Sequence, residues 1–375
     1  MQFALPGVSM PLVYRLLALN PGSTSTKIAV YEDEQPILVE NLLHQAEELA
    51  TFPTLWEQEP FRLRAVRSCL AAHGHDPRGF HAMIGRGGLL RPLESGTYEV
   101  SDDLLRDLRA GVQGEHASNL GGALAHALAS EAGVPAFIVD PVSVDEFEPL
   151  ARISGLAGIE RSSLLHALNI KATARKAALE FGKNLETFDA VVAHLGGGIT
   201  IAALRQGRAI EVNNGIGEGP FSPERTGALP LSKFLELVFS GRYDPPTLRR
   251  FLAGKGGLVS YLGTNDTREV EQRIQRGDHH AALIYEAMAY QIAMEIGAKA
   301  TVLRGRLDAI VLTGGLAHSA MLTGWIEERV SFLGKVVRYP GENELEALAL
   351  GGLRVLRGEE RALRYPRGNS ERSVG

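Results

Sequence analysis

The 375-residue sequence contains a single cysteine, Cys69, and this scarcity excludes two kinds of site. One cysteine cannot form an intramolecular disulfide, and a zinc site built from cysteines needs more than one. Cys69 lies in the segment 61–72, which we expect to be helical, and we expect its thiol to be buried as a small apolar group. Because nothing in the sequence calls for an oxidising compartment, we expect a cytoplasmic protein.

Basic residues are not in excess, and long apolar runs are missing. The formal net charge is −5, so no basic surplus is available to displace counterions from nucleic acid, and we expect no nucleic-acid partner. No apolar run approaches the roughly 18–20 residues of a membrane span, and we expect no membrane partner. The first ten residues lack the features of a signal peptide. We expect them to be a loose extension, with Met10 as an alternative start, and we expect the polar tail 367–375 to be disordered.

Several catalytic motifs are also absent. The sequence has no HExxH, no GxSxG and no pair of histidines at metal-ligand spacing, which leaves hydrolytic and zinc chemistry with little support. Hydrophobic residues make up 45% of the chain and charged residues 22%, as in ordinary globular proteins. The length is that of two domains or of one large duplicated domain.

A short segment rich in hydroxyl groups is the most informative feature that is present. Residues Asn20–Lys27 read NPGSTSTK, follow the apolar run Leu16–Leu19, and precede a second apolar run, Ile28–Tyr31. This pattern predicts a strand, a turn and a returning strand, in contrast to the strand–loop–helix of a GxxxxGK[ST] motif. Backbone N–H groups and hydroxyls converge in such a turn, so it favours a phosphate chain as ligand. A plain Asn-Pro-Gly turn is the alternative.

The same architecture recurs later without the same residues. Ala190–Leu195 is apolar and runs into the glycine triplet Gly196–Gly198, after which Ile199–Leu204 returns. Glycines allow a close backbone approach, which a simple hairpin needs less often, although a plain tight turn remains possible here too. A third apolar run, Ala309–Thr313, ends in Gly314 and Gly315. Together these turns predict a duplicated fold that binds a nucleotide between its halves.

Alternating apolar and amphipathic segments predict an α/β protein with mixed sheets. Further strands are expected at Ile37–Leu42, Ala82–Gly85, Ala136–Val139 and Ala209–Asn213. Helices are expected at Trp56–His73, Asp102–Leu108, Ala117–Glu131, Ser163–Phe181, Leu231–Phe239, Thr247–Leu252, Thr267–Arg276, Ala281–Arg304 and Glu344–Arg357.

Four polar residues are candidates for chemistry. Asp140 ends the expected strand FIVD, where a carboxylate can bind Mg²⁺ through water, although the motif alone favours an Asx turn before Pro141. Arg86 and Arg225 lie in loops rich in glycine or proline. Two such arginines can neutralise a phosphoryl group during its transfer, whereas each taken alone is more often a solvated surface residue. His166 lies among apolar residues, where a histidine is more often a packing residue than a catalytic one.

Taken together, these segments resemble the acetate and butyrate kinase family, whose fold is that of the actin-like, hexokinase-like and Hsp70-like ATPases. The resemblance extends from about residue 13 to about residue 357. It is strongest toward the butyrate kinase branch of the family. The stretches that carry this likeness are NPGSTSTKIAVYEDE (Asn20–Glu34), GRGGLLRP (Gly85–Pro92) and SSLLHALNIKATARK (Ser162–Lys176).

The resemblance implies a role for each matching position. Arg86 and Arg225 would flank the carboxylate and the transferred phosphoryl group, and His166 would hydrogen-bond that group. Mg²⁺ would be held or oriented by Asp140 and Glu344. The nucleotide, ATP or ADP, would be bound by two phosphate turns and an adenosine site. The residues implied for these are Asn20, Ser25 and Lys27 in the first turn, His194, Gly196, Gly197 and Gly198 in the second, and Asp266, Arg268, Gly314 and Gly315 around the adenosine and α-phosphate.

The sequence departs from the acetate kinase pattern in three places. Gly197 stands where acetate kinases have Asn, so one side-chain contact to phosphate is lost. After Gly315, Ala317–Ser319 replaces an expected Gly-Glu-Asn. Gly87 and Gly88 follow Arg86, where acetate kinases have branched apolar residues that enclose a methyl-sized pocket. The vacated space could hold the two extra methylenes of butyrate, or these glycines could serve only a tight turn.

The sequence therefore predicts a duplicated α/β fold of the actin-like ATPase (acetokinase) type, with two domains that each hold a central mixed sheet flanked by helices. One domain would span 12–155 plus 345–375 and the other 156–344. The expected activity is reversible phosphoryl transfer from ATP to a short-chain carboxylate, in the first place butyrate, with Mg²⁺ as cofactor. Isobutyrate or acetate is the alternative substrate, and a non-catalytic nucleotide-binding regulator is the alternative class. The family likeness also implies a homodimer or a larger homo-oligomer.

Overall fold

The computed structural model describes residues 12–366, so the extension and the tail predicted at the two ends lie outside the described residues. The chain forms two compact units, each with its own central sheet. Unit 1 comprises residues up to Leu90, Gly96–Val139 and the residues from Leu345 onward. Unit 2 comprises Arg91–Ser95 and Asp140–Glu344. Residues 140–155, which the sequence analysis places in the first domain, are therefore grouped with the second unit.

Unit 1 is built on a seven-stranded mixed sheet in the order β12-β5-β6-β4-β1-β2-β3. Its strands are β1 (Arg15–Pro21), β2 (Ser25–Glu32), β3 (Gln35–Leu43), β4 (Ala82–Arg86), β5 (Thr97–Glu99), β6 (Ala136–Val139) and β12 (Leu363–Arg364). Its α-helices are α1 (Ala46–Leu49), α2 (Gln58–Ala72), α3 (Asp102–Ala110), α4 (Asn119–Ala132) and α13 (Glu344–Leu356). Two short 3₁₀ turns, η1 (Leu55–Glu57) and η2 (Pro77–Gly79), complete the unit.

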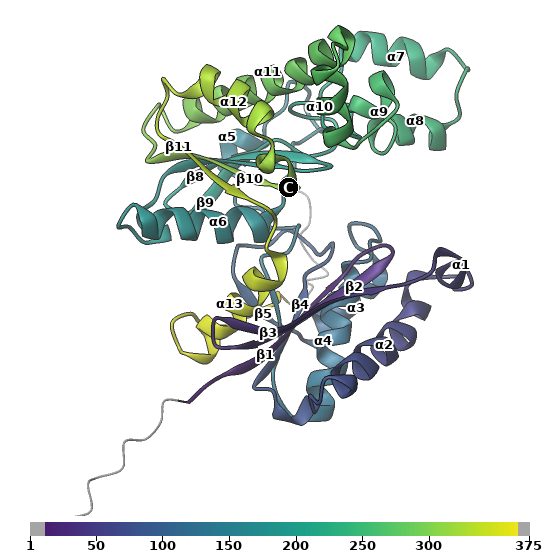
Figure 1. Cartoon of the computed structure of the whole chain (residues 1–375), viewed down its shortest axis with the longest axis vertical. Coiled ribbons are helices and arrows are strands. Elements are labelled where there is room, and N and C mark those ends of the chain that lie inside the picture. The colour runs from purple at the N-terminus through teal and green to yellow at the C-terminus, as the bar shows by residue number, and fades with distance from the viewer. Residues whose placement is uncertain (1–11, 367–375) are drawn as a thin grey trace, which may run out of the picture. The chain divides into compact units, whose positions relative to one another are not determined.

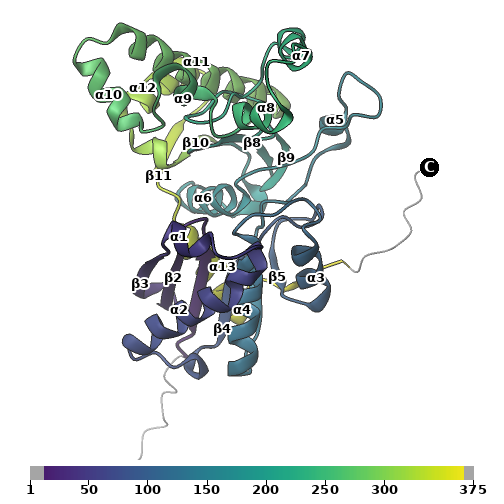
Figure 2. The same ribbon diagram turned by 90° about the vertical axis from the view of Figure 1, so that its right-hand side faces the viewer.

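Helices cover both faces of the unit 1 sheet (Figures 1 and 2). Gly122 of α4 packs against Ile138 of β6, and Gly351 of α13 packs against Val139, the next residue of the same strand. Successive side chains of a strand point to opposite faces, so α4 and α13 lie on opposite sides of the sheet. The strands between them are buried on both sides, which explains why β1, β4 and β6 read as apolar runs.

Unit 2 is built on a five-stranded mixed sheet in the order β11-β10-β7-β8-β9. Its strands are β7 (Ala190–Leu195), β8 (Ile199–Arg205), β9 (Arg208–Val212), β10 (Ala309–Gly314) and β11 (Val336–Pro340). Its α-helices are α5 (Pro149–Arg152), α6 (Ala167–Glu180), α7 (Leu231–Phe239), α8 (Pro245–Leu252), α9 (Gly257–Leu262), α10 (Thr267–Gln275), α11 (His279–Val302) and α12 (Ala320–Val330). The 3₁₀ turns η3 (Leu185–Thr187) and η4 (Gly315–His318) also belong to this unit.

The core of unit 2 lies between the sheet and the helices α11 and α12. Val191, Ala193 and Leu195 of β7 point into this core, so the intervening residue His194 points to the other face. That other face is covered by α6, and Figure 1 shows α6 on one side of the sheet with α11 and α12 on the other. The chain therefore presents His194 toward α6, away from the apolar core.

The predicted duplication is confirmed by the two sheets. In unit 1, β1 pairs in parallel with β4 and antiparallel with β2, which pairs antiparallel with β3. In unit 2, β7 has the same relation to β10, β8 and β9. The hydroxyl-rich turn of unit 1 and the glycine-rich turn of unit 2 thus occupy equivalent positions, each after the first of three consecutive antiparallel strands. The predicted α/β fold, with two domains that each hold a central mixed sheet flanked by helices, is confirmed.

Two local predictions are wrong. Cys69 is half-buried on α2, where burial and the nearby Glu40 carboxylate raise the pKa of its thiol. The helix predicted from Ser163 begins only at Ala167, because Ser163 lies in a loop and its hydroxyl donates to the carbonyl oxygen of Val144. His166 therefore occupies the N-cap position of α6 and does not lie within the helix. Within residues 12–366, no helix combines the length and the apolar character needed to cross a bilayer.

Candidate active site

The first predicted phosphate turn connects β1 to β2 in unit 1. The four residues Gly22–Ser25 are closed by a hydrogen bond of 2.8 Å from the backbone N of Gly22 to the carbonyl oxygen of Ser25. Asn20 is the next-to-last residue of β1 and is only 5% exposed, whereas Ser23 and Thr24 at the tip are exposed. The turn therefore presents small polar groups to solvent from a rigid hairpin.

The predicted turn residues share one face of the sheet. Asn20 is opposite Lys27 in the antiparallel register, so the two side chains lie on the same side. Lys27 lies within β2 rather than in the turn, and it is exposed. Thr26, the intervening residue, points to the opposite face and is fully buried.

Arg86 is brought to the same place by strand pairing. It ends β4, the parallel neighbour of β1, and its Nη1 donates a hydrogen bond of 3.3 Å to Oδ1 of Asn20. The carboxyl ends of parallel strands form the usual ligand edge of an α/β sheet. Unit 1 thus places the predicted catalytic arginine beside the first residue of the predicted phosphate turn.

The two glycines after Arg86 are both buried. An ideal Cβ built on Gly88 would lie 2.3 Å from Oδ1 and 2.6 Å from Cα of Asn119, the first residue of α4. Asn119 is itself fixed, since its Oδ1 accepts from the backbone N of Leu89 at 2.9 Å and its Nδ2 donates to the carbonyl oxygen of Gly114 at 3.1 Å. This close approach favours the alternative that Gly88 is required by backbone packing.

We expect Gly88→Val to lower the melting temperature and to reduce turnover of acetate and butyrate by the same factor. The added side chain must displace the Asn119 backbone, and overpacking of this kind costs about 1–3 kcal/mol. Thermal melts and turnover of both acids test this. Gly155→Val is a control, because a Cβ there meets nothing within 4 Å. A ratio that shifts toward acetate, with little loss of stability, would instead support the interpretation that Gly88 makes room for the acyl chain.

The second predicted phosphate turn, Gly196–Gly198, is accompanied by a pair of histidines in unit 2. The rings of His166 and His194 stack with their centroids 3.9 Å apart and an interplanar angle of 12°. His194 is 2% exposed, and its Nδ1 hydrogen-bonds to Oδ1 of Asn169 at 2.8 Å. His166 is held through its Nδ1 by the hydroxyl of Thr200 at 2.9 Å. Both rings are thereby fixed in orientation next to the glycine triplet.

Arg225 lies directly against this turn. A Cβ added to Gly198 would be 2.4 Å from the guanidinium carbon of Arg225, so only glycine permits this approach. The Nη1 of Arg225 donates to the carbonyl oxygen of Gly215 at 2.9 Å. Burial lowers the pKa of Arg225, while the neighbouring Glu224 acts in the opposite direction. The predicted catalytic residues His166 and Arg225 therefore both border the second turn.

Gly314 and Gly315 lie at the same edge of the unit 2 sheet. β10 is the parallel neighbour of β7, with Thr313 opposite His194. Gly314 has φ of 89°, and a Cβ there would lie 2.4 Å from the carbonyl oxygen of Leu195. At Gly315 nothing lies within 4 Å of an added Cβ. The structure thus places Gly314 and Gly315 next to the second phosphate turn, with open space over Gly315.

Asp266 and Arg268, the residues predicted to contact adenosine, form a local unit at the start of α10. Asp266 is the N-cap and accepts from the backbone N of Arg268 at 3.0 Å. The same carboxylate pairs with the Arg268 guanidinium at 3.0 Å, and this hydrogen bond holds the pKa of Asp266 below its usual value. A cap and an exposed ion pair account for both residues without a ligand, so their contact with adenosine stays a prediction.

The predicted metal ligands are Asp140 and Glu344. Asp140 follows β6, is 5% exposed and has φ of 39°, a conformation uncommon for a residue other than glycine. Its Oδ1 accepts a hydrogen bond of 2.6 Å from the hydroxyl of Ser95. Among residues 12–366, no group of three or more His, Cys, Asp or Glu side chains is arranged to hold a metal. Two carboxylates suit Mg²⁺, which is usually bound by one or two carboxylates together with water and phosphate oxygens.

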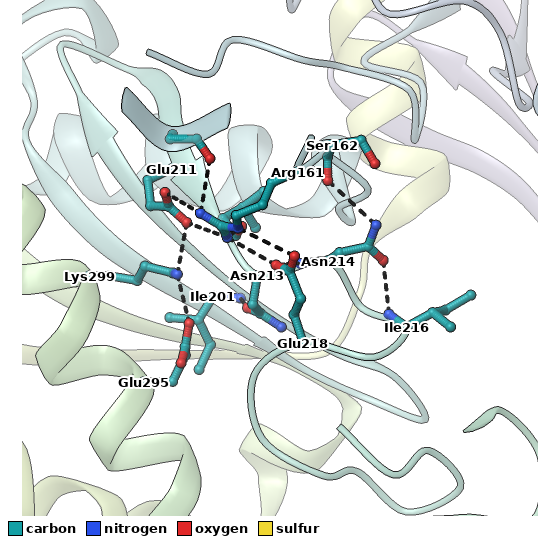
Figure 3. A network of polar contacts seen from close by, with 12 residues as sticks. Arg161, Ser162, Ile201, Glu211, Asn213, Asn214, Ile216, Glu218, Glu295 and Lys299 are labelled. Carbon is teal, nitrogen blue, oxygen red and sulfur yellow. Dashed lines mark hydrogen bonds and ion pairs between the residues drawn. The ribbon is translucent and has the colours of Figure 1, made fainter. Parts of the chain in front are cut away.

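A charged network that the sequence analysis missed supports the loop beside Arg225 (Figure 3). Arg161 donates to both carboxylate oxygens of Glu211, each at 2.8 Å, and to Glu218 at 2.9 Å. Lys299 pairs with the same Glu211 at 3.1 Å and with Glu295 at 2.6 Å. Burial raises the pKa of Glu211, but the hydrogen bonds and charges of Arg161 and Lys299 outweigh burial and hold the pKa below its usual value.

This network fixes the backbone on both sides of Gly215. Glu218 accepts from the backbone N of Asn214 at 3.0 Å, and Asn214 in turn donates to the carbonyl oxygen of Ser162. Asn213 accepts from the backbone N of Ile201 at 2.6 Å. The loop that supplies the acceptor of Arg225 and the segment that leads to His166 are thus tied together. Arginine and glutamate separated by 50 residues carry no local signal, so sequence reasoning could not find this contact.

Comparisons with known proteins bear on the fold of the chain and on its family likeness. Residues 157–338, most of unit 2, match the model of the acetokinase family. In structure the chain is similar to acetate kinase from Porphyromonas gingivalis, with 17% identity and a TM-score of 0.74, over 89% of this chain and 98% of that one. A propionate kinase from Francisella tularensis is similar at 19% identity and TM-score 0.73, over 90% and 98% of the two chains. Acetate kinase from Entamoeba histolytica is similar at 14% identity and a TM-score of 0.72, over 90% of this chain and 98% of that one. At these identities the similar structures define the fold.

Proposed function

We propose that the chain is a kinase of the acetokinase family. It reversibly transfers the γ-phosphoryl group of ATP to a short-chain carboxylate, in the first place butyrate, giving butyryl phosphate and ADP. The observation that carries the proposal is the placement of Arg86 and Arg225. Each lies at the carboxyl edge of its own unit's sheet, beside a turn suited to phosphate. The similar acetate and propionate kinases support the same reaction class.

The proposed chemistry needs no general base. A short-chain carboxylic acid is already ionised at neutral pH, so its oxygen can attack phosphorus directly. The protein then has to align the reactants and neutralise charge on the transferred group. Arg86 and Arg225 supply positive charge, and His166, oriented by Thr200, supplies a hydrogen bond.

Mg²⁺ and the nucleotide complete the proposed site. Asp140 and Glu344 would hold Mg²⁺, which when bound neutralises charge on the phosphate oxygens. The two turns would bind the phosphate chain, using Asn20, Ser25 and Lys27 in unit 1 and His194 and Gly196–Gly198 in unit 2. Asp266, Arg268, Gly314 and Gly315 would contact the nucleoside and α-phosphate. Chelation of Mg²⁺ with EDTA should abolish turnover, and added Mg²⁺ should restore it.

The alternative class is a nucleotide-binding regulator on the same fold, which needs only the nucleotide contacts. The presence of Arg86, His166 and Arg225 at the edges of the sheets favours the enzyme. Trapping of acyl phosphate with hydroxylamine, over a series of acids from formate to hexanoate and including isobutyrate, separates the candidates. We expect a maximum at butyrate. A maximum at acetate or isobutyrate would correct the substrate, and ATP binding without any hydroxamate would favour the regulator.

Self-association stays a prediction. Unit 2 carries large exposed apolar side chains on two helices, Leu231 and Phe239 on α7 and Leu283, Tyr290 and Met294 on α11. Their exposure, 83% for Phe239, is what a protein surface that pairs with a second copy would show in an isolated chain.

A further inference from the structure

Arg62 is a buried cation that none of the roles above requires. It lies on α2 in unit 1, and its side chain is completely shielded from solvent. Among residues 12–366 no carboxylate forms an ion pair with it, and its side-chain partner on the same helix is the neutral Gln58, at 3.0 Å. Burial lowers the pKa of Arg62 to about 10, so the guanidinium remains charged at neutral pH. A buried charge without a counterion is costly, which suggests that its partner is a ligand or a structure that function requires.

The other hydrogen bonds of Arg62 all go to the phosphate turn. Its Nη1 donates to the carbonyl oxygen of Ser25 at 2.8 Å and to the hydroxyl of Thr26 at 3.1 Å. Its Nη2 donates to the carbonyl oxygen of Ser23 at 3.3 Å. The arginine therefore lies behind the turn, on the side of the sheet opposite to Asn20 and Arg86.

These contacts determine which way the turn's backbone points. In a planar trans peptide the N–H is directed opposite to the C=O. Because the Ser23 carbonyl points toward Arg62, the N–H of Thr24 points away from it, toward the exposed tip of the turn. The Thr24 carbonyl is also engaged, since it accepts from the backbone N of His44 at 2.9 Å. With the carbonyls of Ser23, Thr24 and Ser25 all bonded within the protein, the tip presents a donor and hydroxyls to an anion.

The neighbouring side chain His44 adds no second charge to that of Arg62. Its Nε2 hydrogen-bonds to the Thr26 hydroxyl at 2.9 Å, next to the guanidinium. Burial and the charge of Arg62 both lower the pKa of His44, so the ring is neutral at pH 7. The cluster of Arg62, Thr26 and His44 thus has one full positive charge, located behind the turn.

We propose that Arg62 is a positioning residue for the terminal phosphates of the nucleotide. It holds the turn Gly22–Ser25 with its donors outward, and it supplies a fixed positive charge that the bound phosphate offsets. This inference rests on the proposed function, because it takes ATP or ADP as the ligand. It assigns Arg62 no contact with the reacting atoms.

The test is a Kd for ATP by isothermal titration calorimetry on the full chain. Arg62→Met keeps the side-chain volume but removes the charge and the hydrogen bonds. We expect its Kd for ATP to rise roughly 10- to 100-fold, the effect that loss of a supporting contact has on a bound ion. The KM for ATP should rise by a similar factor, while the KM for the carboxylate changes little. Thr26→Val is the matched control, since it disturbs the same cluster but keeps the charge, and its Kd should change less than about threefold.

Each outcome decides one question. An unchanged Kd in Arg62→Met, measured well below its melting temperature, overturns this inference and leaves the proposed function intact. So does an equal loss of affinity in Thr26→Val, which would mean that any damage to the cluster has the same effect. If Arg62→Met does not fold, Arg62→Lys replaces it: a Kd raised about three- to tenfold supports the inference and an unchanged Kd contradicts it. If the unmodified chain binds neither ATP nor ADP, the proposed function fails and this inference fails with it.

Discussion

Replacement of Arg86 or Arg225 by alanine should lower kcat by roughly 10²–10⁴ and leave the KM for ATP nearly unchanged. The reason is that each guanidinium is expected to meet charge that develops on the phosphoryl group during transfer. An interaction that is stronger in the transition state than in the ground state appears in kcat. Both residues lie where this is geometrically possible within their own units, Arg86 beside Asn20 and Arg225 against Gly198.

The conservative variants make this prediction more specific. Arg86→Lys and Arg225→Lys should recover only part of the activity, because an ammonium group cannot make the planar two-pronged contact of a guanidinium. Arg106→Ala and Arg208→Ala are controls in the two units, since both side chains are mostly exposed, at 68% and 52%, and pair only at the surface. Near-full kcat in either alanine variant would make that arginine a surface residue and would place the site elsewhere. Thermal melts of all variants separate lost chemistry from lost folding.

Most of the fold could be predicted from sequence because the central strands of both sheets are buried. Strand β7, Ala190–Leu195, was predicted with its observed bounds, since this buried and mainly apolar run lies between Asp189 and the glycine triplet. Elements with weak patterns were missed. Strand β5 has only three residues, and β11 is half-exposed and charged. Helix α12 follows a Gly-rich segment, which reads as loop, and it is stabilised by the cap at Ser319 and by packing on α11.

The candidate site was predictable where it depends on turns, and not where it depends on distant contacts. In each unit the residues after two parallel strands could be grouped, those after β1 and β4 in unit 1 and those after β7 and β10 in unit 2, because parallel strands have their carboxyl ends at the same edge of their sheet. His166 was placed on a helix because its neighbours are apolar, yet the contact between Ser163 and Val144 delays the start of α6. Arg62 is one of three arginines in the predicted helix Trp56–His73, and nothing in the local sequence distinguishes it from Arg64 and Arg67. Its burial depends on the turn 37 positions earlier in the chain, which no local pattern encodes.

The charged network of unit 2 gives the second large effect. We expect Arg161→Met to lower the free energy of unfolding by about 3 kcal/mol, because it leaves the buried carboxylate of Glu211 without its two-pronged partner. The Glu211 side chain is 9% exposed and that of Arg161 is 25% exposed, so water can replace little of what is lost. Lys299 remains, and its bond to Glu211 keeps the cost at the low end of the range for broken buried pairs.

The same variant should also reduce catalysis, because Arg161 and Glu218 hold the loop that contains Gly215. With the Gly215 carbonyl displaced, Arg225 loses its acceptor, and kcat should fall by roughly 10- to 100-fold. Chemical denaturation and steady-state kinetics measure the two effects. Arg338→Met is the control, since Arg338 and its partner Glu327 are 35% and 42% exposed, and loss of such a surface pair costs about 0–1 kcal/mol.

A double-mutant cycle then assigns the stability effect to the network. The double variant Arg161→Met/Glu218→Gln should lose less stability than the sum of the losses of the two single variants, because both substitutions break the same contact. Full additivity would mean that Arg161 and Glu218 do not stabilise each other, and Glu211 would then be the partner through which Arg161 acts. Unchanged kcat in a folded Arg161→Met would show that the loop keeps Gly215 in place without the network. In that case the position of Arg225 would depend on its close contact with Gly198, and Gly198→Ala would be the variant that displaces it.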